Sequence, residues 1–417
     1  MGETYRHQAE TMAGTGRARH MTAQFRLRRS DDIVERGSVV RSLTGTQAAV
    51  LASAALGLFA ALVLKVSLMP LSNTDMTRYV LPWFEAKQAH GLGVLGMDVT
   101  DYSPFYSYLL LLTTLLPDWV KPLTAIKLVS VAGDAALAVM AGLLAHALTG
   151  DRLRGLVAGV VVFALPTVIV NGSAWGQTDA IWSAAILGAV LAMLRGRGAA
   201  AVLLYGLAVA YKPQAAFLGP ILLAFLLSRR QARLLLLVPV PYLLLALPPI
   251  LAGRPWHAVL GVYLAGFEGF DQLSYDAPGL WTWLQFVLPN TDGVVLAGLM
   301  LAAAAGGGLT LLALRGGRLH GMALLHGAAL SCALLPFLTP KMHSRYFFVA
   351  EVLMVLSACL KPALLPLAIA SQTAALLAYQ PFLAGLINWR VPLAVLFNLL
   401  AIGLLAWLWL RTRRAQA

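Results

Sequence analysis

Ionisable side chains interrupt an otherwise apolar sequence at a few points, and chemistry is expected at those points. The first is the stretch after Pro70, which contains Asp75 and Arg78. A carboxylate at the mouth of a membrane cavity, partly desolvated and close to a cation, has the setting of a general base. A solvated loop position or a helix N-cap would explain Asp75 equally well, so both interpretations stay open at this point.

Two further positions place charge at membrane depth. Lys212 interrupts the apolar stretch between Leu203 and Leu227, and such a group either faces a cavity or partner or snorkels to the interface. Lys127 and Asp134 are seven residues apart, which predicts that they share one helix face. An ion pair between them would be either structural or functional.

Three potential cations follow Pro340. If this connection is extended, Lys341, His343 and Arg345 point the same way, because side chains alternate along an extended chain. Such a group suits a phosphate, which Arg345 can bind through two parallel hydrogen bonds. Positive anchors at lipid headgroups are the structural alternative.

The elements that must position these residues are membrane-spanning helices. Of the 417 residues, 59% are hydrophobic and only 12% are charged, whereas a soluble domain is about 25% charged. Apolar runs close to the length of a membrane span recur along the chain, which excludes a soluble α/β or all-β domain and an outer-membrane barrel. Cys332 and Cys359 lie in apolar segments without disulfide or metal-ligand spacing. We therefore expect an all-α polytopic membrane protein.

The basic connections predict the topology. Placing the amino-terminal stretch, the short basic connections and the carboxyl-terminal tail in the cytoplasm collects 21 Lys and Arg against six acids on that side. This positive-inside pattern predicts both termini inside. The predicted spans are twelve: 46–68, 122–148, 155–171, 177–194, 198–212, 213–228, 234–251, 292–314, 319–338, 344–360, 362–380 and 390–410.

The predicted organisation follows from these spans. Ser103–Leu116 is expected to lie at the outer interface, because another crossing would invert every later basic loop. All the polar positions above fall on the external side, where two long loops are expected to be functional. The regions are a basic tail at 1–44, a first transmembrane module at 45–251 with external loop 69–121, a second external loop at 252–291, a second transmembrane module at 292–410 and a tail at 411–417.

Five short motifs, in order along about residues 45–350, resemble those of the GT-C superfamily of polyprenyl-phosphate-sugar glycosyltransferases. The likeness is to the dolichyl-phosphate-glucose glucosyltransferases of N-glycan assembly and their prokaryotic relatives. In this sequence the first-loop acid stands alone, and the third motif lacks the usual histidine. The motifs are Asn73–Tyr79, Asp101–Tyr108, Gly176–Asp179, Tyr211–Gln214 and Met342–Tyr346.

The resemblance implies a GT-C-like bundle of about 12 helices and a metal-independent, inverting sugar transfer without a cofactor. The donor would be a polyprenyl-phosphate sugar, and the acceptor a hydroxyl of a lipid or glycan on the non-cytoplasmic face of the cell membrane. Asp75 would be the catalytic base of the first module. The donor phosphate would be held by Lys212, His343, Arg345 and Arg78, and sugar or acceptor hydroxyls by Asp101, Tyr102, Gln177, Asp179 and Gln214.

Two other classes were weighed against this one. A transporter or flippase of lipid-linked sugars would be expected to show related halves and broken helices near the membrane midplane, and no internal repeat is evident. A non-catalytic scaffold would not need an acid beside a cation cluster. The expected partners are donor, acceptor and membrane lipids, and not nucleic acid, because the cytoplasmic loops account for the net charge of +13.

Overall fold

The computed structural model describes residues 44–100, 102–263, 270–315, 317–385 and 389–414. The chain divides into two units, Met1–Leu51 and Ala52–Ala417. In the first unit only residues 44–51 are described, and they include the start of helix α2 (Gly45–Leu68). The fold below is that of the second unit.

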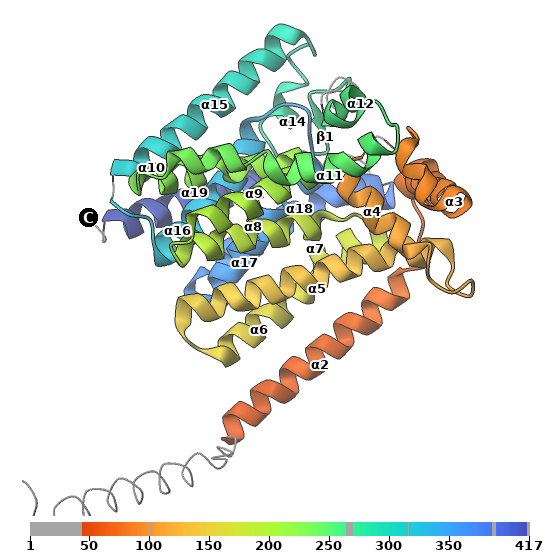
Figure 1. The fold of residues 1–417 in the computed structure, drawn as a ribbon. Helices are drawn as coiled ribbons and strands as arrows, with labels where there is room; N and C mark the ends of the chain where they lie inside the picture. Colours follow the sequence, from red (N-terminus) through yellow and green to blue (C-terminus); the bar gives the residue numbers. More distant parts are fainter. Residues whose placement is uncertain (1–43, 101, 264–269, 316, 386–388, 415–417) are drawn as a thin grey trace, which may run out of the picture. The chain divides into compact units, whose positions relative to one another are not determined.

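This second unit is built almost entirely of helices (Figure 1). Its longest complete helices are α5 (Pro122–Thr149), α15 (Asp292–Arg315) and α19 (Arg390–Arg414). The remaining elements are η1 (Met76–Val80), α3 (Leu81–His90), η2 (Gly91–Gly96), α4 (Pro104–Thr113), α6 (Arg152–Phe163), α7 (Pro166–Ile169), η3 (Val170–Trp175), α8 (Asp179–Leu194), α9 (Gly198–Tyr211), η4 (Pro213–Leu218), α10 (Gly219–Ser228), η5 (Ala232–Leu237), α11 (Val240–Leu251), α12 (Trp256–Leu260), β1 (Ser274–Tyr275), α14 (Trp281–Leu284), α16 (Gly321–Leu338), β2 (Met342–His343), η6 (Ser344–Phe347), α17 (Phe348–Leu360), η7 (Pro362–Leu364) and α18 (Leu365–Ala384).

Every segment predicted to span the membrane is helical over most of its length. Among the described residues, seven helices are long and apolar enough to cross a membrane, and the count rises to eight if the bent pair α6–α7 is one span. The chain is therefore an all-α, multi-pass membrane protein. The predicted interfacial segment contains α4, a helix of 10 residues, and about 15 Å of helix reaches only halfway across a hydrocarbon core.

The predicted span at 155–171 is broken, which the hydropathy pattern did not reveal. The axis bends by 51° between α6 and the segment Pro166–Trp175. Pro166 follows the break at the first position of α7, where its missing N–H costs no helical hydrogen bond. The chain then continues as the π-helix η3, which ends at Trp175.

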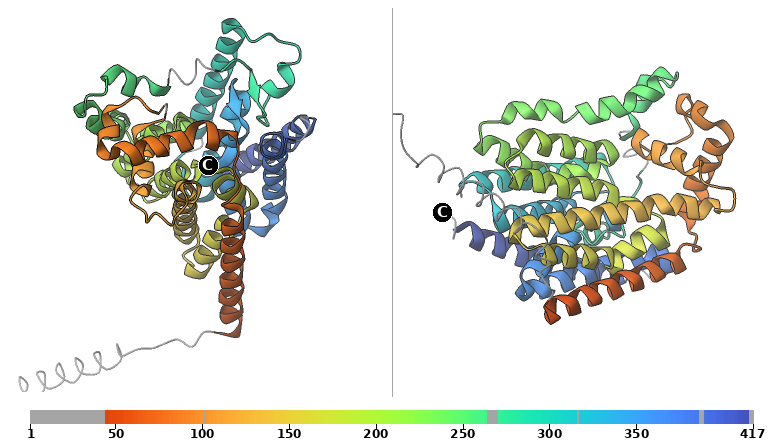
Figure 2. Two further views of the ribbon diagram at one scale, coloured as in Figure 1. Left: turned by 90° about the vertical axis from the view of Figure 1, so that its right-hand side faces the viewer. Right: turned by 60° about the horizontal axis from the view of Figure 1, so that its bottom comes forward.

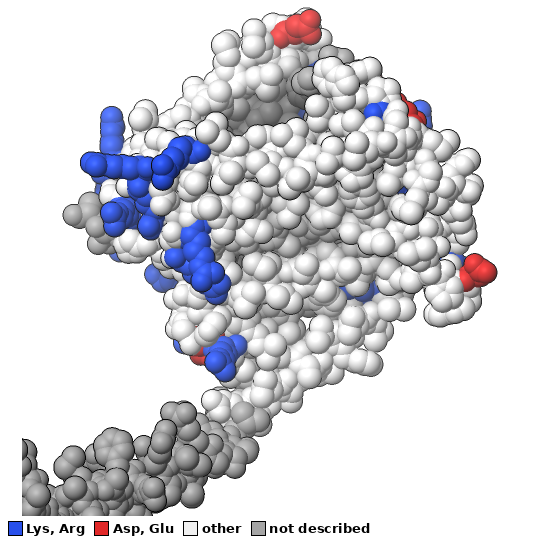
Figure 3. Space-filling view, viewed as in Figure 1, with Lys and Arg blue, Asp and Glu red and all other residues white. Residues whose placement is uncertain are grey.

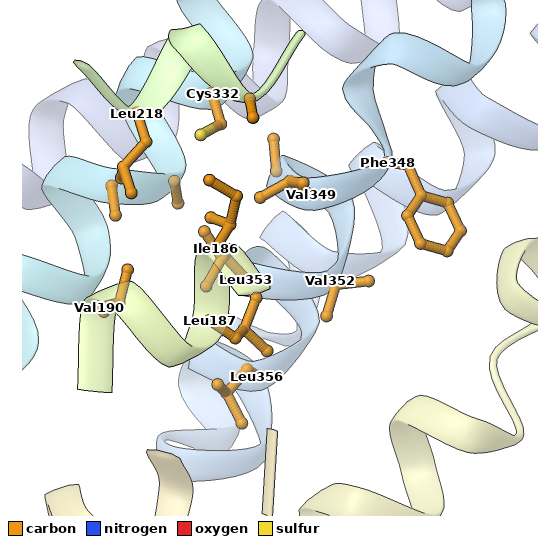
Figure 4. Close-up of a cluster of buried hydrophobic side chains, with 14 of the residues drawn as sticks. Ile186, Leu187, Val190, Leu218, Cys332, Phe348, Val349, Val352, Leu353 and Leu356 are labelled. Carbon is orange, nitrogen blue, oxygen red and sulfur yellow. The ribbon is translucent and has the colours of Figure 1, made fainter. Parts of the chain in front are cut away.

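Helices of this unit pack through apolar and small side chains. Ile186 and Leu187 of α8 lie with Leu353 and Leu356 of α17 in a buried cluster (Figure 4). Between α5 and α6 the backbones approach closely, since a Cβ added at Gly142 would lie 2.9 Å from a carbonyl oxygen of α6. Small residues at such contacts are typical of helix packing in membranes, where dispersion contacts replace the hydrophobic effect.

Basic side chains and short helices lie at opposite ends of the bundle. Lys and Arg side chains gather where α5 joins α6, α8 joins α9 and α10 joins η5 (Figure 3). The short elements α3, α4 and α12 lie at the other end, and the long helices run side by side between them (Figures 1 and 2). The segments that carry the candidate chemistry belong to this second end.

Candidate functional site

A cavity of about 340 Å³ brings together segments that are far apart in the sequence. The loop between α2 and α5, the η3–α8 connection and the α16–α17 connection each contribute to its wall. Its lining residues are Asp75, Met76, Tyr79, Val80, Trp83, Tyr102, Tyr106, Gly176, Gln177, Thr178, Phe270, His343, Arg345 and Tyr346.

The Asp75 carboxylate is fixed in the wall by two hydrogen bonds to one of its oxygens. Trp175 Nε1 and Gln177 Nε2 each donate to Asp75 Oδ2 at 3.0 Å. The side chain remains 27% exposed. Both donors bind Oδ2, and no described residue donates a hydrogen bond to Oδ1, so we infer that Oδ1 is the oxygen that can accept one from a ligand.

Asn73 connects the loop that carries Asp75 to the segment that holds it. Its side-chain carbonyl accepts from the Met76 N–H at 3.1 Å, as an N-cap residue does, and its amide donates to the Trp175 carbonyl at 2.8 Å. Gly176 follows with φ of +81°, a left-handed conformation that glycine adopts without steric cost. This turn carries the chain from Trp175 to Gln177, so both donors reach the same carboxylate.

Lys127 of α5 also connects the loop of Asp75 to η3. Its Nζ donates to the carbonyls of Leu71, Ser173 and Ala174 at 2.6, 2.8 and 2.9 Å, and the residue is fully buried. Leu71 precedes the loop of Asp75, and the other two carbonyls belong to η3. A buried ammonium therefore fixes the donors of Asp75 relative to its loop.

A second carboxylate, Asp179, lies beneath the cavity and is completely buried. Lys212 Nζ lies 2.5 Å from Asp179 Oδ1, and Trp182 Nε1 donates to the same oxygen at 3.1 Å. Asn171 Nδ2 donates to Oδ2 at 3.0 Å. Buried charge is tolerated where it is paired and hydrogen-bonded in this way.

Arg345 lies between the two carboxylates. Its Nη1 is 3.9 Å from Asp75 Oδ2, and its Nε is 3.8 Å from Asp179 Oδ2. The guanidinium also faces the ring of Trp175 at 5.2 Å. Its side chain is 12% exposed, so it is largely desolvated but reaches the cavity.

A two-stranded parallel sheet positions His343. Strand β2 pairs with β1, and His343 opposes Tyr275. Its ring stacks on Tyr275 with centroids 4.7 Å apart, and Phe270 meets it edge-on at 5.0 Å. Burial, reinforced by the nearby Arg345 and Lys212, holds the pKa of His343 well below its usual range. The imidazole is therefore neutral at neutral pH.

The structure brings only some of the predicted site residues to one cavity. Asp75, Tyr102, Gln177, His343 and Arg345 all line it, with Asp179 and Lys212 directly beneath. Arg78 is exposed outside the lining, with its guanidinium 5.5 Å from the Tyr79 ring. Gln214 lies in η4, also outside the lining, and Asp101 lies outside the described residues.

Two geometric expectations from the sequence are wrong. Asp134 pairs with Lys65 at 2.7 Å rather than with Lys127, whose ammonium binds carbonyls instead. The connection after Pro340 is not extended throughout, because Lys341 has φ of +61° and a 3-10 turn begins at Ser344. His343 and Arg345 therefore reach the cavity from a strand and a helical turn.

Several residues of the site had been given no role in it from the sequence. Trp175 stands beside a recognised motif, so its indole was a recognisable candidate donor. Asn171 and Lys127 lie inside predicted spans, where the only signal is a polar group at membrane depth. Tyr106 and Tyr346 lie within two of the motifs, and Phe270 lies in the predicted loop 252–291, but nothing in the sequence distinguishes these three from core aromatics.

These residues could accept a proton from a ligand and bind a negatively charged group beside it. A fixed carboxylate with one free oxygen can accept a proton, and an adjacent desolvated guanidinium can bind and stabilise negative charge. Within the described ranges, no three His, Cys, Asp or Glu side chains are placed to hold a metal ion. Comparison of the sequence with models of known protein families and with curated proteins gives no match.

Proposed function

We propose that the chain is an inverting glycosyltransferase that uses a polyprenyl-phosphate sugar, with Asp75 as its general base. The observation that carries the proposal is the pairing in one cavity of a fixed carboxylate with Arg345, 3.9 Å away, in a membrane protein. The ordered motifs that resemble GT-C enzymes supply the sugar and the lipid carrier.

In the proposed reaction the acceptor hydroxyl oxygen attacks the anomeric carbon of the donor. The bond between that carbon and the phosphate oxygen breaks, and its electron pair leaves with the polyprenyl phosphate. The hydroxyl proton passes to Asp75 Oδ1, and the configuration at the anomeric carbon inverts. Arg345 stabilises the phosphate as its negative charge grows, which is how a preorganised cation lowers such a barrier.

Charge balance in the site supports this division of roles. Asp75 and Asp179 carry two negative charges, Lys212 and Arg345 carry two positive charges, and His343 is neutral. When Asp75 takes the proton, the site gains one net positive charge as the leaving phosphate gains negative charge. Lys212 acts in this scheme through Asp179, since its ammonium is 2.5 Å from that carboxylate and does not line the cavity.

The proposal includes a GT-C-like bundle with twelve spans, both termini in the cytoplasm and the cavity on the outer side of the cell membrane. It is supported by the basic connections, which gather at the end of the bundle opposite α3 and α4 (Figures 1 and 3). A positive end of this kind faces the cytoplasm in multi-pass proteins. The acceptor would be a lipid-linked or glycan hydroxyl.

The test is transfer from a panel of labelled polyprenyl-phosphate sugars by the purified protein and by Asp75→Asn. Asparagine keeps the shape and the hydrogen bonds to Oδ2 but cannot take a proton, so we expect transfer to fall about 10²- to 10⁴-fold while donor binding persists. Asp118→Asn, an exposed carboxylate of the same external loop, is the matched control. Full activity of Asp75→Asn would remove Asp75 from this role.

A transporter or flippase of lipid-linked sugars is the second candidate, and the bend of 51° between α6 and α7 favours it. Broken helices beside a binding site are typical of transporters. The same panel separates the two classes, because only an enzyme forms a new glycosidic bond. Movement of labelled donor across proteoliposomes without any transferred sugar would favour the transporter.

A further inference from the structure

A second cavity, of about 430 Å³, lies beside the one that contains Asp75. Its walls come from helix α3, from the stretch after η2 and from the residues around α12. No residue of the proposed reaction lines it. Its lining residues are Tyr79, Trp83, Asp98, Val99, Thr100, Arg254, His257, Ala258, Gly261 and Val262.

The two cavities share an aromatic wall. Tyr79 and Trp83 line both of them, and their ring centroids are 6.2 Å apart. Trp83 in turn contacts Tyr102, which also lines the first cavity, with ring centroids 5.6 Å apart. A ligand that lies on this wall can therefore extend from one cavity into the other.

Another part of the wall of the second cavity holds a hydrogen-bonded charged pair. Arg254 Nη2 donates to the Asp98 carboxylate and to the Thr100 carbonyl, the latter at 3.1 Å. The Arg254 side chain is only 8% exposed, whereas the Asp98 side chain is 67% exposed. The pair joins the two external loops and presents donors and an acceptor side by side.

This chemistry selects a ligand class. Hydroxyl groups both donate and accept hydrogen bonds, so a wall with a guanidinium, a carboxylate, an imidazole and a threonine hydroxyl suits several hydroxyls at once. A free anion is a poorer ligand for this cavity, because the exposed Asp98 carboxylate would repel it. Faces of Tyr and Trp rings pack against the apolar C–H faces of sugar rings, and pockets with apolar walls and a few fixed polar groups are typical of small-molecule sites.

We propose that the second cavity binds a sugar ring of the acceptor, in contact with the wall formed by Tyr79 and Trp83 and with the Arg254–Asp98 pair. The acceptor role rests on the proposed function, whereas sugar binding stands on the cavity itself. Asp75 and Tyr79 are four residues apart along a helical stretch, so their side chains are neighbours. Since Tyr79 lines both cavities and Asp75 lines the first, we expect a hydroxyl of the bound acceptor to extend along this shared wall toward the Asp75 carboxylate.

The experiment measures binding of a panel of methyl glycosides to the full chain in nanodiscs by saturation-transfer NMR. Ala258→Phe fills the second cavity without adding bulk to the first. We expect this substitution to lower the affinity for the methyl glycoside at least tenfold. Asp98→Asn, which leaves the volume of the side chain almost unchanged, should also lower the affinity for the glycoside. Leu260→Phe is the matched control, because Leu260 lies on the same helix but not in the lining.

Donor binding is followed in parallel with polyprenyl phosphate, which all four proteins should bind alike. No saturable glycoside binding by the wild type, or equal binding by Ala258→Phe and Leu260→Phe, would overturn the proposal. If glycoside binding behaves as expected but no panel donor yields transfer, the sugar site stands and the proposed enzyme fails. If transfer occurs but Ala258→Phe leaves the acceptor KM unchanged, the site is wrong and the enzyme stands.

Discussion

At the scale of single residues, side chains of the same type differ in whether they line the cavity. Arg345 and Arg78 are both arginines close to Asp75 in the expected site, yet only Arg345 lines the cavity. Lys212 is committed to Asp179 at 2.5 Å. Arg345 is therefore the proposed phosphate ligand, because it lies between two carboxylates and carries the only guanidinium among the described residues that line the cavity.

Arg345→Ala should weaken binding of polyprenyl phosphate about tenfold or more, because a desolvated charge-assisted contact is lost. Arg78→Ala should leave binding unchanged, since Arg78 is exposed outside the cavity. Equilibrium binding of labelled polyprenyl phosphate to both proteins in detergent measures the difference. Equal affinities would argue against Arg345 as the phosphate ligand.

His343 predicts a pH dependence of stability. Its pKa is depressed in the folded protein by burial and by the neighbouring cations, so below about pH 6.5 the unfolded chain binds a proton that the folded chain does not. Wild-type stability should fall as the pH falls through this range. The loss reaches about 1.4 kcal/mol per pH unit for one such group.

His343→Phe keeps the aromatic contacts with Tyr275 and Phe270 but cannot titrate. We expect the drop in Tm between neutral pH and about pH 5 to be smaller in this variant than in the wild type. Thermal unfolding in detergent at the two pH values measures it. An equal drop in both proteins would show that His343 is not the group responsible.

At the scale of elements, the site depends on a helix that is broken and on a lysine that joins its pieces. After the bend at Pro166, η3 leads to Trp175 and Gln177, whose side chains bind Asp75 in the loop between α2 and α5. Lys127 ties the same loop to η3 through three carbonyls. π-helical turns are frequent at functional sites, where they re-aim side chains.

Lys127→Met should uncouple these elements. Each carbonyl that stays buried without its donor costs about 1–3 kcal/mol, so we expect a lower Tm and at least a tenfold loss of transfer, with polyprenyl phosphate binding retained through Arg345. Lys121→Met, an exposed lysine just before α5, is the control. Transfer by Lys127→Met at the wild-type rate would contradict a positioning role.

At the scale of the whole molecule, the distribution of charge predicts which connections face each side of the membrane. Cysteines placed at Asp118 and Pro213 should react with an impermeant thiol reagent from outside the cell, and one at Arg197 should not. All three residues are exposed, and the background would carry Cys332→Ala and Cys359→Ala. The result at Pro213 decides the number of spans, because this position faces outward only if the short helices on either side of it cross the membrane.

Labelling at Asp118 without labelling at Pro213 would instead leave the stretch from α6 to α10 on the cytoplasmic side. In that case the spans would be close to the seven that length and hydropathy select. The cavity would then have to be reached differently, because Gln177 belongs to that stretch and lines it.

The sequence by itself determined the helical, membrane-embedded character of this protein and the position of its helices along the chain. Hydropathy and charge act locally, so runs of apolar residues and basic connections are legible without coordinates. It also selected Asp75, Gln177, His343 and Arg345, whose polarity is conspicuous in apolar surroundings.

Only the tertiary structure decided which of these residues meet. The bend at Pro166, the pairing of Asp134 with Lys65 and the engagement of Lys212 by Asp179 depend on how helices distant in the sequence pack together. Hydrogen bonds and ion pairs act over a few ångströms, and spacing along a chain does not report such distances between separate helices. The second cavity has the same origin, because its walls come from two loops that lie more than a hundred residues apart in the sequence.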